Sequence, residues 1–280
     1  MRPPPKVKDL LLQRIMRRYI VGYSLQDALR AARRVVRAGW QVTVCPWNFP
    51  DDSPEKVAQN YVAAVQGIAA VTSGGYVSVK ARALAYSLDL LREVIAAAKP
   101  HNMRIHFDSL EPETAEATFR LIEQALAEYP NLGCTLPARW RRSARDVHRV
   151  LEWQIPVRVV KGQWKDPEAP ESDLDAAFLS LLGKLAGRSV HVAVATHNVS
   201  LARRAFSLLR ETGTPSRLEV LYGLPLRVAH VAGELNMGVT MYIPYGRACL
   251  PYDIYVLRKN PVILKWMLRD LLMGDHFQLP

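Results

Sequence analysis

The chain has 280 residues, of which 49% are hydrophobic and 22% are charged, and its formal net charge is +11 at pH 7. A chain of this length can bury a large core as one domain. No segment reaches the ~18 consecutive apolar residues that a membrane-spanning helix needs, because Lys265 and Arg269 interrupt the apolar stretch 262–273. Residues 1–8 carry charge and three prolines without an apolar secretory core, so no signal peptide is expected.

The three cysteines, Cys45, Cys134 and Cys249, are far apart and lack metal-ligand spacing. This usage favours a reducing compartment, and we expect a cytoplasmic protein without a structural metal. The positive charge is spread along the chain, although arginines form two clusters, at positions 30–37 and 139–145. Neither cluster belongs to a known nucleic-acid-binding module, so nucleic acid is not an expected partner. Solvated helix faces are the favoured interpretation, while steering of an anionic ligand or contact with an acidic membrane surface stays open.

Short β-branched apolar runs alternate with segments in which apolar residues recur at helical spacing. The runs predict eight strands, at Gln41–Val44, Tyr76–Val79, Met103–Phe107, Gly133–Leu136, Val157–Val160, Val190–Ala195, Leu218–Leu221 and Val239–Ile243. The helical segments follow them, at Pro54–Ala70, Ser87–Ala98, Thr114–Glu128, Ala144–Trp153, Leu174–Ala186, Ser200–Thr212, Pro225–Leu235 and Pro251–Met273. The alternation predicts an α/β fold, a single-domain (β/α)8 TIM-like barrel over residues 41–280 with an N-terminal helical extension over residues 1–40.

Polar residues follow most of the predicted strands, and the carboxyl ends of parallel strands share one open face of a barrel. The polar positions are Lys80, Asp108, Arg158 with Lys161, Thr196-His197-Asn198, Tyr222-Gly223 and Tyr242. We expect Arg158, Lys161 and Trp164 to lie in a loop that the fifth strand delivers to this face. The set lacks the carboxylate pair of a glycosidase and the histidine and carboxylate cluster of a metal hydrolase. Its excess of positive charge suits an anionic, phosphate-bearing cofactor.

Six motifs occur in a fixed order along the chain. They are Tyr76-Val-Ser-Val-Lys80, Ile105-His-Phe-Asp108, Arg158-Val-Val-Lys-Gly-Gln-Trp164, Ala195-Thr-His-Asn198, Leu221-Tyr-Gly223 and Tyr242-Ile-Pro-Tyr-Gly246. Each motif is weak alone, but their order and spacing resemble the proline dehydrogenases, FAD-dependent flavoenzymes on a distorted (β/α)8 barrel. The resemblance runs from about Ser24 to the C-terminal helix.

The resemblance implies a role for each matching residue. Arg158 would lie near the reactive flavin nitrogen and act in catalysis together with Lys80 and Asp108. The positions implied for FAD binding are Arg158, Lys161, Gly162, Trp164, Thr196, His197 and Asn198. The positions implied for substrate binding are Lys80, Asp108, Leu221, Tyr242 and Tyr255.

Structural explanations compete with these roles. Lys80 and Asp108 could form a salt bridge at the strand ends, and His197 could be a hydrogen-bonded structural histidine. The role of Gly162 and Gly223 could be limited to permitting tight turns of the backbone. Trp164 and Tyr222 could cap the barrel core.

The chain also departs from the family pattern. The helix after the eighth strand carries, in the family, an arginine pair that clamps the substrate carboxylate. An ungapped alignment puts Tyr255 and Val256 at those positions, whereas a gapped one would use Arg258 and Lys259. The acidic motif after the first strand is replaced by residues 45–49, a glutamine after the fourth strand by Pro137, and Ala-Tyr after Lys-Gly by Gln163-Trp164.

These observations predict an FAD-dependent dehydrogenase or oxidase of CH–NH donors that acts on an amine, imino acid or proline-like heterocycle other than free L-proline. The alternatives are a true proline dehydrogenase that uses Arg258 and Lys259, a non-catalytic binding homologue, and a lyase or isomerase with Lys80 as a Schiff base. A quinone or another acceptor, at a membrane surface such as the inner membrane face, would take the electrons. An oligomer stays open.

Overall fold

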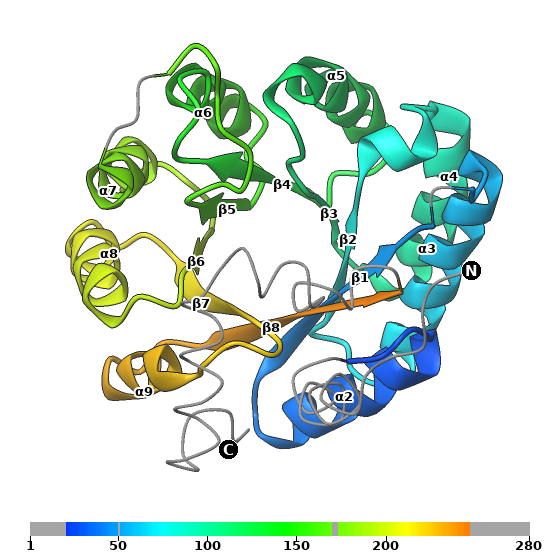
Figure 1. Cartoon of the computed structure of the whole chain (residues 1–280), viewed down its shortest axis with the longest axis horizontal. Coiled ribbons are helices and arrows are strands. Elements are labelled where there is room, and N and C mark those ends of the chain that lie inside the picture. The colour runs from blue at the N-terminus through cyan, green and yellow to red at the C-terminus, as the bar shows by residue number, and fades with distance from the viewer. Residues whose placement is uncertain (1–20, 50, 170–172, 247–280) are drawn as a thin grey trace, which may run out of the picture.

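Eight parallel strands close into a barrel in chain order in the computed structural model, which describes residues 21–49, 51–169 and 173–246 (Figure 1). The strands are β1 (Gln41–Trp47), β2 (Tyr76–Val79), β3 (Ile105–Phe107), β4 (Leu132–Pro137), β5 (Val157–Val160), β6 (Val192–Ala195), β7 (Ser216–Leu221) and β8 (Val239–Gly246). The barrel closes because β1 pairs in parallel with both β2 and β8. The predicted (β/α)8 fold class is confirmed.

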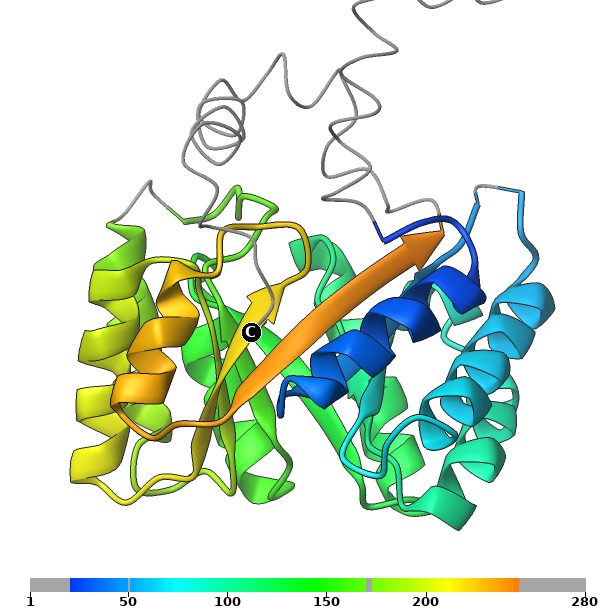
Figure 2. The same cartoon turned by 90° about the horizontal axis from the view of Figure 1, so that it is seen from below.

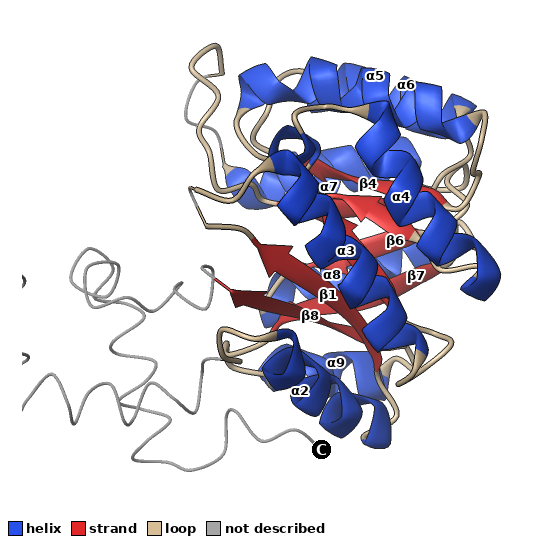
Figure 3. Ribbon diagram, turned by 90° about the vertical axis from the view of Figure 1, so that its right-hand side faces the viewer, coloured by secondary structure: helices blue, strands red, loops and turns tan. Residues whose placement is uncertain are grey.

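Helices cover the barrel on its outside, so that the strands are enclosed (Figure 3). Those that connect successive strands are α3 (Pro54–Ala69), α4 (Leu88–Ala98), α5 (Ala115–Leu126), α6 (Ser143–Glu152), α7 (Leu174–Leu185), α8 (Val199–Glu211) and α9 (Arg227–Glu234). Short 3₁₀ turns are η1 (Ala81–Leu84), η2 (Lys99–His101) and η3 (Pro112–Thr114). Several helices begin where a side chain accepts a backbone N–H, as at Ser53, Ser87 and Asp173, which satisfies donors that the first turn leaves free.

Helix α2 (Leu25–Arg37) begins at a capping box, in which Ser24 and Asp27 exchange hydrogen bonds between side chain and backbone. Its apolar stripe, which includes Ala28, Ala32 and Val35, is buried, and the helix packs against β1 and β8. Helix α2 stands between α9 and α3 in the ring (Figure 1). The described part of the predicted N-terminal extension is therefore built into the barrel wall. The predicted helix Pro251–Met273 lies outside the described residues.

The barrel interior is polar, although such barrels usually fill it with branched apolar side chains. Successive strand residues point to opposite faces, and here the apolar ones, such as Val77 and Val79 of β2, lie in the buried core. The polar residues buried in the strands and directly at their ends include Thr43, Ser78, Lys80, His106, Thr135, Arg158, Glu219 and Thr240. Figure 2 shows the arrowhead of β8 at the upper rim, which marks the carboxyl ends of the parallel strands.

Within residues 21–49, 51–169 and 173–246, no helix has the length and apolar character to cross a membrane. Cys45 and Cys134 are buried free thiols.

Candidate active site

Lys80, Asp108 and Arg158 come together at the carboxyl end of the barrel. Lys80 and Asp108 directly follow β2 and β3, and the Lys80 Nζ lies 3.6 Å from the Asp108 Oδ2. The expectation that these two residues form an ion pair at neighbouring strand ends therefore agrees with the geometry.

The prediction that Arg158 lies in a loop is wrong. Arg158 is the second residue of β5, and only 4% of its surface is exposed. The alternation of side chains along a strand turns it into the barrel, where its guanidinium lies between β2, β3 and β7. Tyr242 also lies inside its strand, β8, and not after it.

Asp108 accepts hydrogen bonds from several sides. Its Oδ1 accepts from Arg158 Nη1 at 2.6 Å and from Ser78 Oγ at 3.0 Å, and its Oδ2 accepts from the Tyr242 hydroxyl at 2.7 Å. Burial raises the pKa of Asp108, but the charges of Lys80 and Arg158 outweigh it and hold that pKa below its ordinary value. A carboxylate whose pKa lies below its ordinary value is a poor proton acceptor at neutral pH. Asp108 therefore serves to anchor and orient its neighbours.

A second carboxylate, Glu219 of β7, holds the other side of Arg158. The Arg158 Nη2 lies 2.7 Å from the Glu219 Oε1 as an ion pair without hydrogen-bond geometry. Glu219 Oε2 accepts from the Tyr76 hydroxyl at 2.8 Å. Burial lowers the pKa of Arg158, but Glu219, Tyr76 and Asp108 together raise it well above its ordinary value. Arg158 is thus a permanent cation whose Nε has no partner in the described part of the chain.

Glu219 was not predicted as a site residue, although the sequence holds a signal for it. Charged residues in the middle of an apolar strand are rarely buried unless they are paired. Arg217 and Glu219 alternate with the apolar Leu218 and Val220 in β7, which indicates that a polar face of this strand points into the barrel.

Lys80 is enclosed by Cys45 and Trp47. Both lie in β1, which extends beyond the predicted strand Gln41–Val44. The Lys80 Nζ donates to the Cys45 Sγ at 2.8 Å and lies 4.2 Å from the centre of the Trp47 ring. Burial raises the pKa of the Cys45 thiol to about 11, against the opposing effect of Lys80, so the thiol is neutral. The Lys80 backbone N–H donates to the Tyr61 hydroxyl at 3.0 Å, which fixes the end of β2.

The loop after β5 contains a glycine that no other residue could replace without strain. Gly162 has φ +96°, and a Cβ there would lie 2.8 Å from Pro137 Cβ. The preceding Lys161 forms an ion pair with Asp175 of α7. Asp175 also accepts from the Asn198 amide at 3.4 Å, so it joins the ends of β5 and β6.

The end of β6 leads directly into α8. Asn198 caps this helix by accepting from the Leu201 N–H at 3.0 Å, and its own N–H donates to Thr196 Oγ1 at 3.1 Å. The N-terminus of α8 therefore lies at the carboxyl end of the barrel beside Lys161. Exposed N–H groups and the helix dipole favour a phosphate at such a place.

His197 has a structural arrangement of hydrogen bonds. Its Nδ1 lies 3.0 Å from the Pro225 carbonyl oxygen, and its Nε2 accepts the Leu221 N–H at 2.9 Å. These partners require a neutral ring with the proton on Nδ1, and burial lowers its pKa. Both polar edges of His197 are occupied, so it could touch a cofactor only through ring carbons.

The remaining predicted residues are placed less centrally. Trp164 is half-buried, and its backbone oxygen accepts from Trp140 Nε1 at 3.0 Å. Leu221 ends β7 in register with Tyr242. Tyr255 and its neighbour Val256 lie outside the described residues, as do Arg258 and Lys259.

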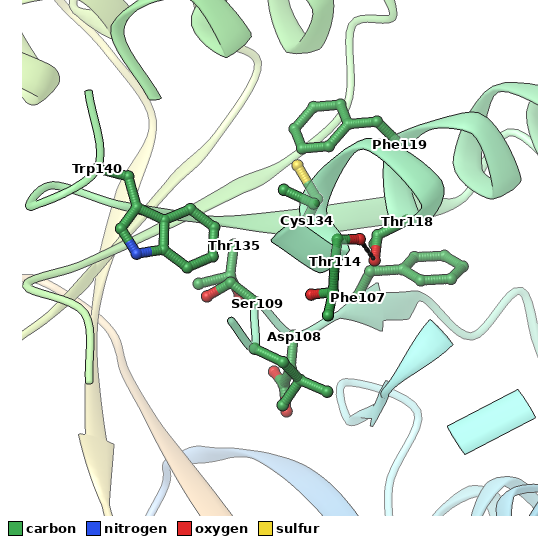
Figure 4. Close-up of a pocket in the computed structure, with 11 residues that line it drawn as sticks. Phe107, Asp108, Ser109, Thr114, Thr118, Phe119, Cys134, Thr135 and Trp140 are labelled. Carbon is green, nitrogen blue, oxygen red and sulfur yellow. Dashed lines mark hydrogen bonds between the residues drawn. The ribbon is translucent and has the colours of Figure 1, made fainter. Parts of the chain in front are cut away.

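A hollow lies beside Asp108, between β3, β4 and α5, with Trp140 and Phe119 at its sides (Figure 4). The hollow is partly open to solvent. Thr118 hydrogen-bonds the Thr114 carbonyl at 2.9 Å on its wall. Only water-sized molecules fit it, so this hollow does not hold a substrate ring.

Comparison with known proteins confirms the resemblance. Residues 50–254 match the family model described as "Proline dehydrogenase". The chain is 24% identical to "Proline dehydrogenase 1" of Bacillus subtilis (strain 168) over 275 residues, which cover 91% of this chain and 90% of that protein. It is 22% identical to "Proline dehydrogenase" of Deinococcus radiodurans over 294 residues, with 96% and 95% covered.

Solved structures share the fold. Proline utilization A (PutA) from Bdellovibrio bacteriovorus superposes with a TM-score of 0.76 at 16% identity. The match covers 94% of this chain but only 33% of PutA, so the chain spans about a third of that protein.

Proposed function

Because this chain belongs to the proline dehydrogenase family, we propose that it is an FAD-dependent dehydrogenase that oxidises a C–N bond of a proline-like secondary amine. The observation that carries this proposal is the buried cluster of Lys80, Asp108 and Arg158 at the carboxyl end of the barrel. Substrates of (β/α)8 enzymes bind at this end.

The residues around β5 and β6 fit the diphosphate part of FAD. Lys161 supplies a cation, the N-terminus of α8 supplies a helix dipole, and Gly162 allows the backbone to turn tightly. Thr196 and Asn198 add a hydroxyl and an amide at the same place. In this proposal Lys161 exchanges its Asp175 partner for the cofactor.

When bound, an oxidised flavin accepts two electrons from the substrate carbon next to nitrogen. The residues of this chain would set the conditions for that transfer. Arg158 is held between Asp108 and Glu219 as a fixed cation, and its Nε donor has no partner among the described residues. A fixed cation stabilises negative charge that develops nearby, without reorganisation of the site.

Lys80 would select the reactive form of the amine. Oxidation requires a neutral amine nitrogen, and a positive charge nearby disfavours the protonated form. Lys80 is 5% exposed and is held by Cys45, Trp47 and Asp108. We therefore assign Lys80 to the substrate side, where its charge orients the amine and favours binding of the form that has already released its proton to solvent.

The identity of the amine depends on the residues at the clamp positions, in the segment 251–273 that the sequence predicts to be helical and that lies outside the described residues. The names of the relatives favour L-proline itself. The sequence favours another amine, since Tyr255 and Val256 occupy the clamp positions in the ungapped alignment. We retain the second as our prediction: L-proline bleaches the flavin slowly, and the variant Tyr255→Arg with Val256→Arg accelerates it. Fast bleaching by L-proline in the wild type would instead assign the clamp to Arg258 and Lys259.

The electron acceptor is proposed as a quinone or another small molecule. Arg30, Arg33, Arg34 and Arg37 are exposed on α2, and a cationic helix face of this kind favours an anionic membrane surface. A location at the inner membrane face would follow.

The deciding experiment starts from the absorption spectrum of the purified protein. A yellow protein whose flavin is bleached anaerobically by one amine of a cyclic and acyclic panel supports the proposal. Lys80→Met should slow the bleaching about 100-fold at unchanged flavin content. The matched control is Lys99→Met, which makes the same change at an exposed lysine of η2 and should bleach at the wild-type rate.

Other outcomes separate the alternatives. A folded, colourless protein that takes up no FAD would contradict the proposal and favour a non-catalytic homologue. Trapping of Lys80 by borohydride with a carbonyl substrate would favour the lyase. Equal bleaching by the wild type and Lys80→Met would make Lys80 a structural residue.

A further inference from the structure

Three cationic or titratable side chains gather at the opposite, amino end of the barrel. We call Arg104, His191 and Arg217 the amino-mouth cluster. Arg104 directly precedes β3, His191 directly precedes β6, and Arg217 is the second residue of β7. All three are half-buried. Residues two places further on, such as His106 after Arg104 and Glu219 after Arg217, are buried, so alternation directs the cluster toward the barrel interior.

The three side chains lie near one another. Burial lowers the pKa of His191 to about 4, with the charges of Arg104 and Arg217 acting in the same direction. The Arg104 guanidinium lies 4.6 Å from the centre of the Tyr76 ring, inside the barrel wall. The cluster thus concentrates like charge, which costs free energy unless something compensates it.

No carboxylate in the described part of the chain pairs with this cluster. Arg217 donates to the Val239 carbonyl at 3.2 Å and to the Thr240 hydroxyl at 3.4 Å, and Arg104 has the Tyr76 ring. Glu219 is already engaged by Arg158 and Tyr76. The loops that enter the strands at this end contain one acidic residue, Glu128, which pairs with Arg92.

Buried nitrogen atoms without a partner also lie at this end. His106 is 1% exposed, and its Nδ1 has no hydrogen-bond partner within the described residues. Its other nitrogen, Nε2, is used by the Thr135 hydroxyl at 3.1 Å. The Nδ1 of His191 is unpartnered in the same way. Buried polar atoms are normally satisfied, so such atoms require an explanation.

Two glycines leave room for these groups. A Cβ at Gly133 would lie 2.7 Å from the His106 Nδ1, and one at Gly238 would lie 2.4 Å from the Arg217 guanidinium carbon. Neither glycine has a positive φ, so the backbone alone does not demand glycine there. The room is used by the side chains of His106 and Arg217.

We propose that the amino-mouth cluster binds a phosphate-sized oxyanion, as inorganic phosphate or as the phosphoryl group of a small metabolite. Two guanidinium groups present planar forks of N–H donors that match phosphate oxygens, and an imidazole adds a further donor. A dianion would supply the charge that this end lacks. The site lies at the end of the barrel opposite Lys161 and α8, and so is separate from the proposed cofactor site.

The test measures the melting temperature of the flavin-loaded protein in sodium phosphate and in sodium chloride at equal ionic strength. Phosphate should raise the melting temperature of the wild type by several degrees, because a ligand of the folded state stabilises it. Arg104→Gln with Arg217→Gln should lose the increment, and calorimetric titration should give at least a tenfold weaker dissociation constant. Arg188→Gln is the matched control, since it removes an exposed arginine from the same end of the barrel, and it should keep the increment.

Two further arms make the result decisive. Glycerol phosphate in place of inorganic phosphate tests whether the site binds a phosphate ester as well as the free oxyanion. The larger ester raises the melting temperature only if the cluster is accessible from solvent. Lys161→Met tests the other end of the barrel and should keep the phosphate response. If the double variant is unstable, Arg104→Gln alone serves, since its guanidinium lies against the Tyr76 ring and forms no hydrogen bond or ion pair within the described residues. No response in the wild type, an equal response in the double variant, or loss of the response only in Lys161→Met would overturn the proposal.

Discussion

The two ends of the barrel treat charge in opposite ways. At the carboxyl end, the cations Lys80 and Arg158 face the carboxylates Asp108 and Glu219. At the amino end, Arg104, His191 and Arg217 have no carboxylate partner among the described residues. A balanced site can hold its groups rigidly and accept a ligand of low net charge, whereas an unbalanced one is completed by an anion.

One side chain connects the two ends. The Tyr76 ring lies against Arg104, and its hydroxyl donates to Glu219 at 2.8 Å and lies 3.4 Å from Arg158 Nη2. Burial and the charge of Glu219 raise the pKa of Tyr76 to about 12, so this link is a neutral phenol. The two ends therefore differ in charge balance although the neutral Tyr76 side chain contacts both. Substitutions at the two ends can be compared directly.

The largest expected effect separates the two arginines of the interior. Arg158→Leu should lower the free energy of unfolding by about 3–5 kcal/mol, because it leaves Asp108 and Glu219 buried without their common partner. Arg217→Leu should change it by less than about 1 kcal/mol, since it removes a cation that has no carboxylate partner among the described residues and relieves repulsion. Urea unfolding monitored by circular dichroism measures both.

Arg158→Lys is the control for this comparison, because it keeps the charge and should recover part of the lost stability. Equal losses for Arg158→Leu and Arg217→Leu would show that the two ends do not differ in charge balance. The same argument bears on flavin binding: loss of colour in an Arg158 variant reports on folding as well as on the cofactor, so Lys161 is the cleaner position.

The comparison also shows which features the sequence could predict. The eight strands and the meeting of Lys80 with Asp108 follow from alternation and from strand order, which are local signals. The inward direction of the Arg158 side chain depends on which residues of the four-residue strand β5 face the barrel interior. The prediction placed Arg158 in a loop, where side chains do not alternate, and so missed this direction. The same period-2 pattern in Arg104-Ile-His-Phe-Asp108 and in Arg217-Leu-Glu219 would have placed the polar residues of both segments inside the barrel.

Other features could not be predicted from sequence patterns. Helix α2 takes a place in the ring because its alanine stripe fits β1 and β8, which only tertiary packing decides. The two hydrogen bonds of His197 come from the backbone of Leu221 and from the Pro225 carbonyl, and no motif encodes such partners. Asp175 is far in sequence from Asn198, so its position between Lys161 and Asn198 is likewise a result of the fold.

A pH series should show an effect of intermediate size. Burial lowers the pKa of His106, His191 and His197 below the ordinary 6.5, so the unfolded chain binds more protons than the folded one below that pH. The free energy of unfolding should therefore be constant above about pH 6.5 and fall as the pH drops to 5. Each histidine contributes up to about 1.4 kcal/mol per pH unit.

Variants at the two ends divide this slope. His191→Gln should remove the contribution of His191 to the pH dependence of the free energy of unfolding. Phosphate should reduce that contribution in the wild type, because a bound anion raises the pKa of His191. His197→Asn should remove the contribution of His197 to this pH dependence, which phosphate does not alter. Asp108 does not interfere, since its lowered pKa affects stability only below about pH 3.8. A slope unchanged in both variants would contradict the assignment of neutral histidines.

The smallest expected effect concerns Lys161, whose counterion the cofactor would displace in the proposed function. Lys161 pairs with Asp175, and the two side chains are 37% and 33% exposed, so the pair is worth at most about 1 kcal/mol. Asp175→Asn removes the competing charge while its amide can still hydrogen-bond Asn198. FAD should then bind the apoprotein up to about fivefold more tightly, as measured by fluorescence quenching during titration. Asp89→Asn is the matched control, because it makes the same change in an exposed pair with Arg92 and should leave FAD affinity unchanged. Weaker FAD binding in Asp175→Asn alone would mean that Asp175 shapes the cofactor site, and that the charge of Lys161 is not what the cofactor takes from it.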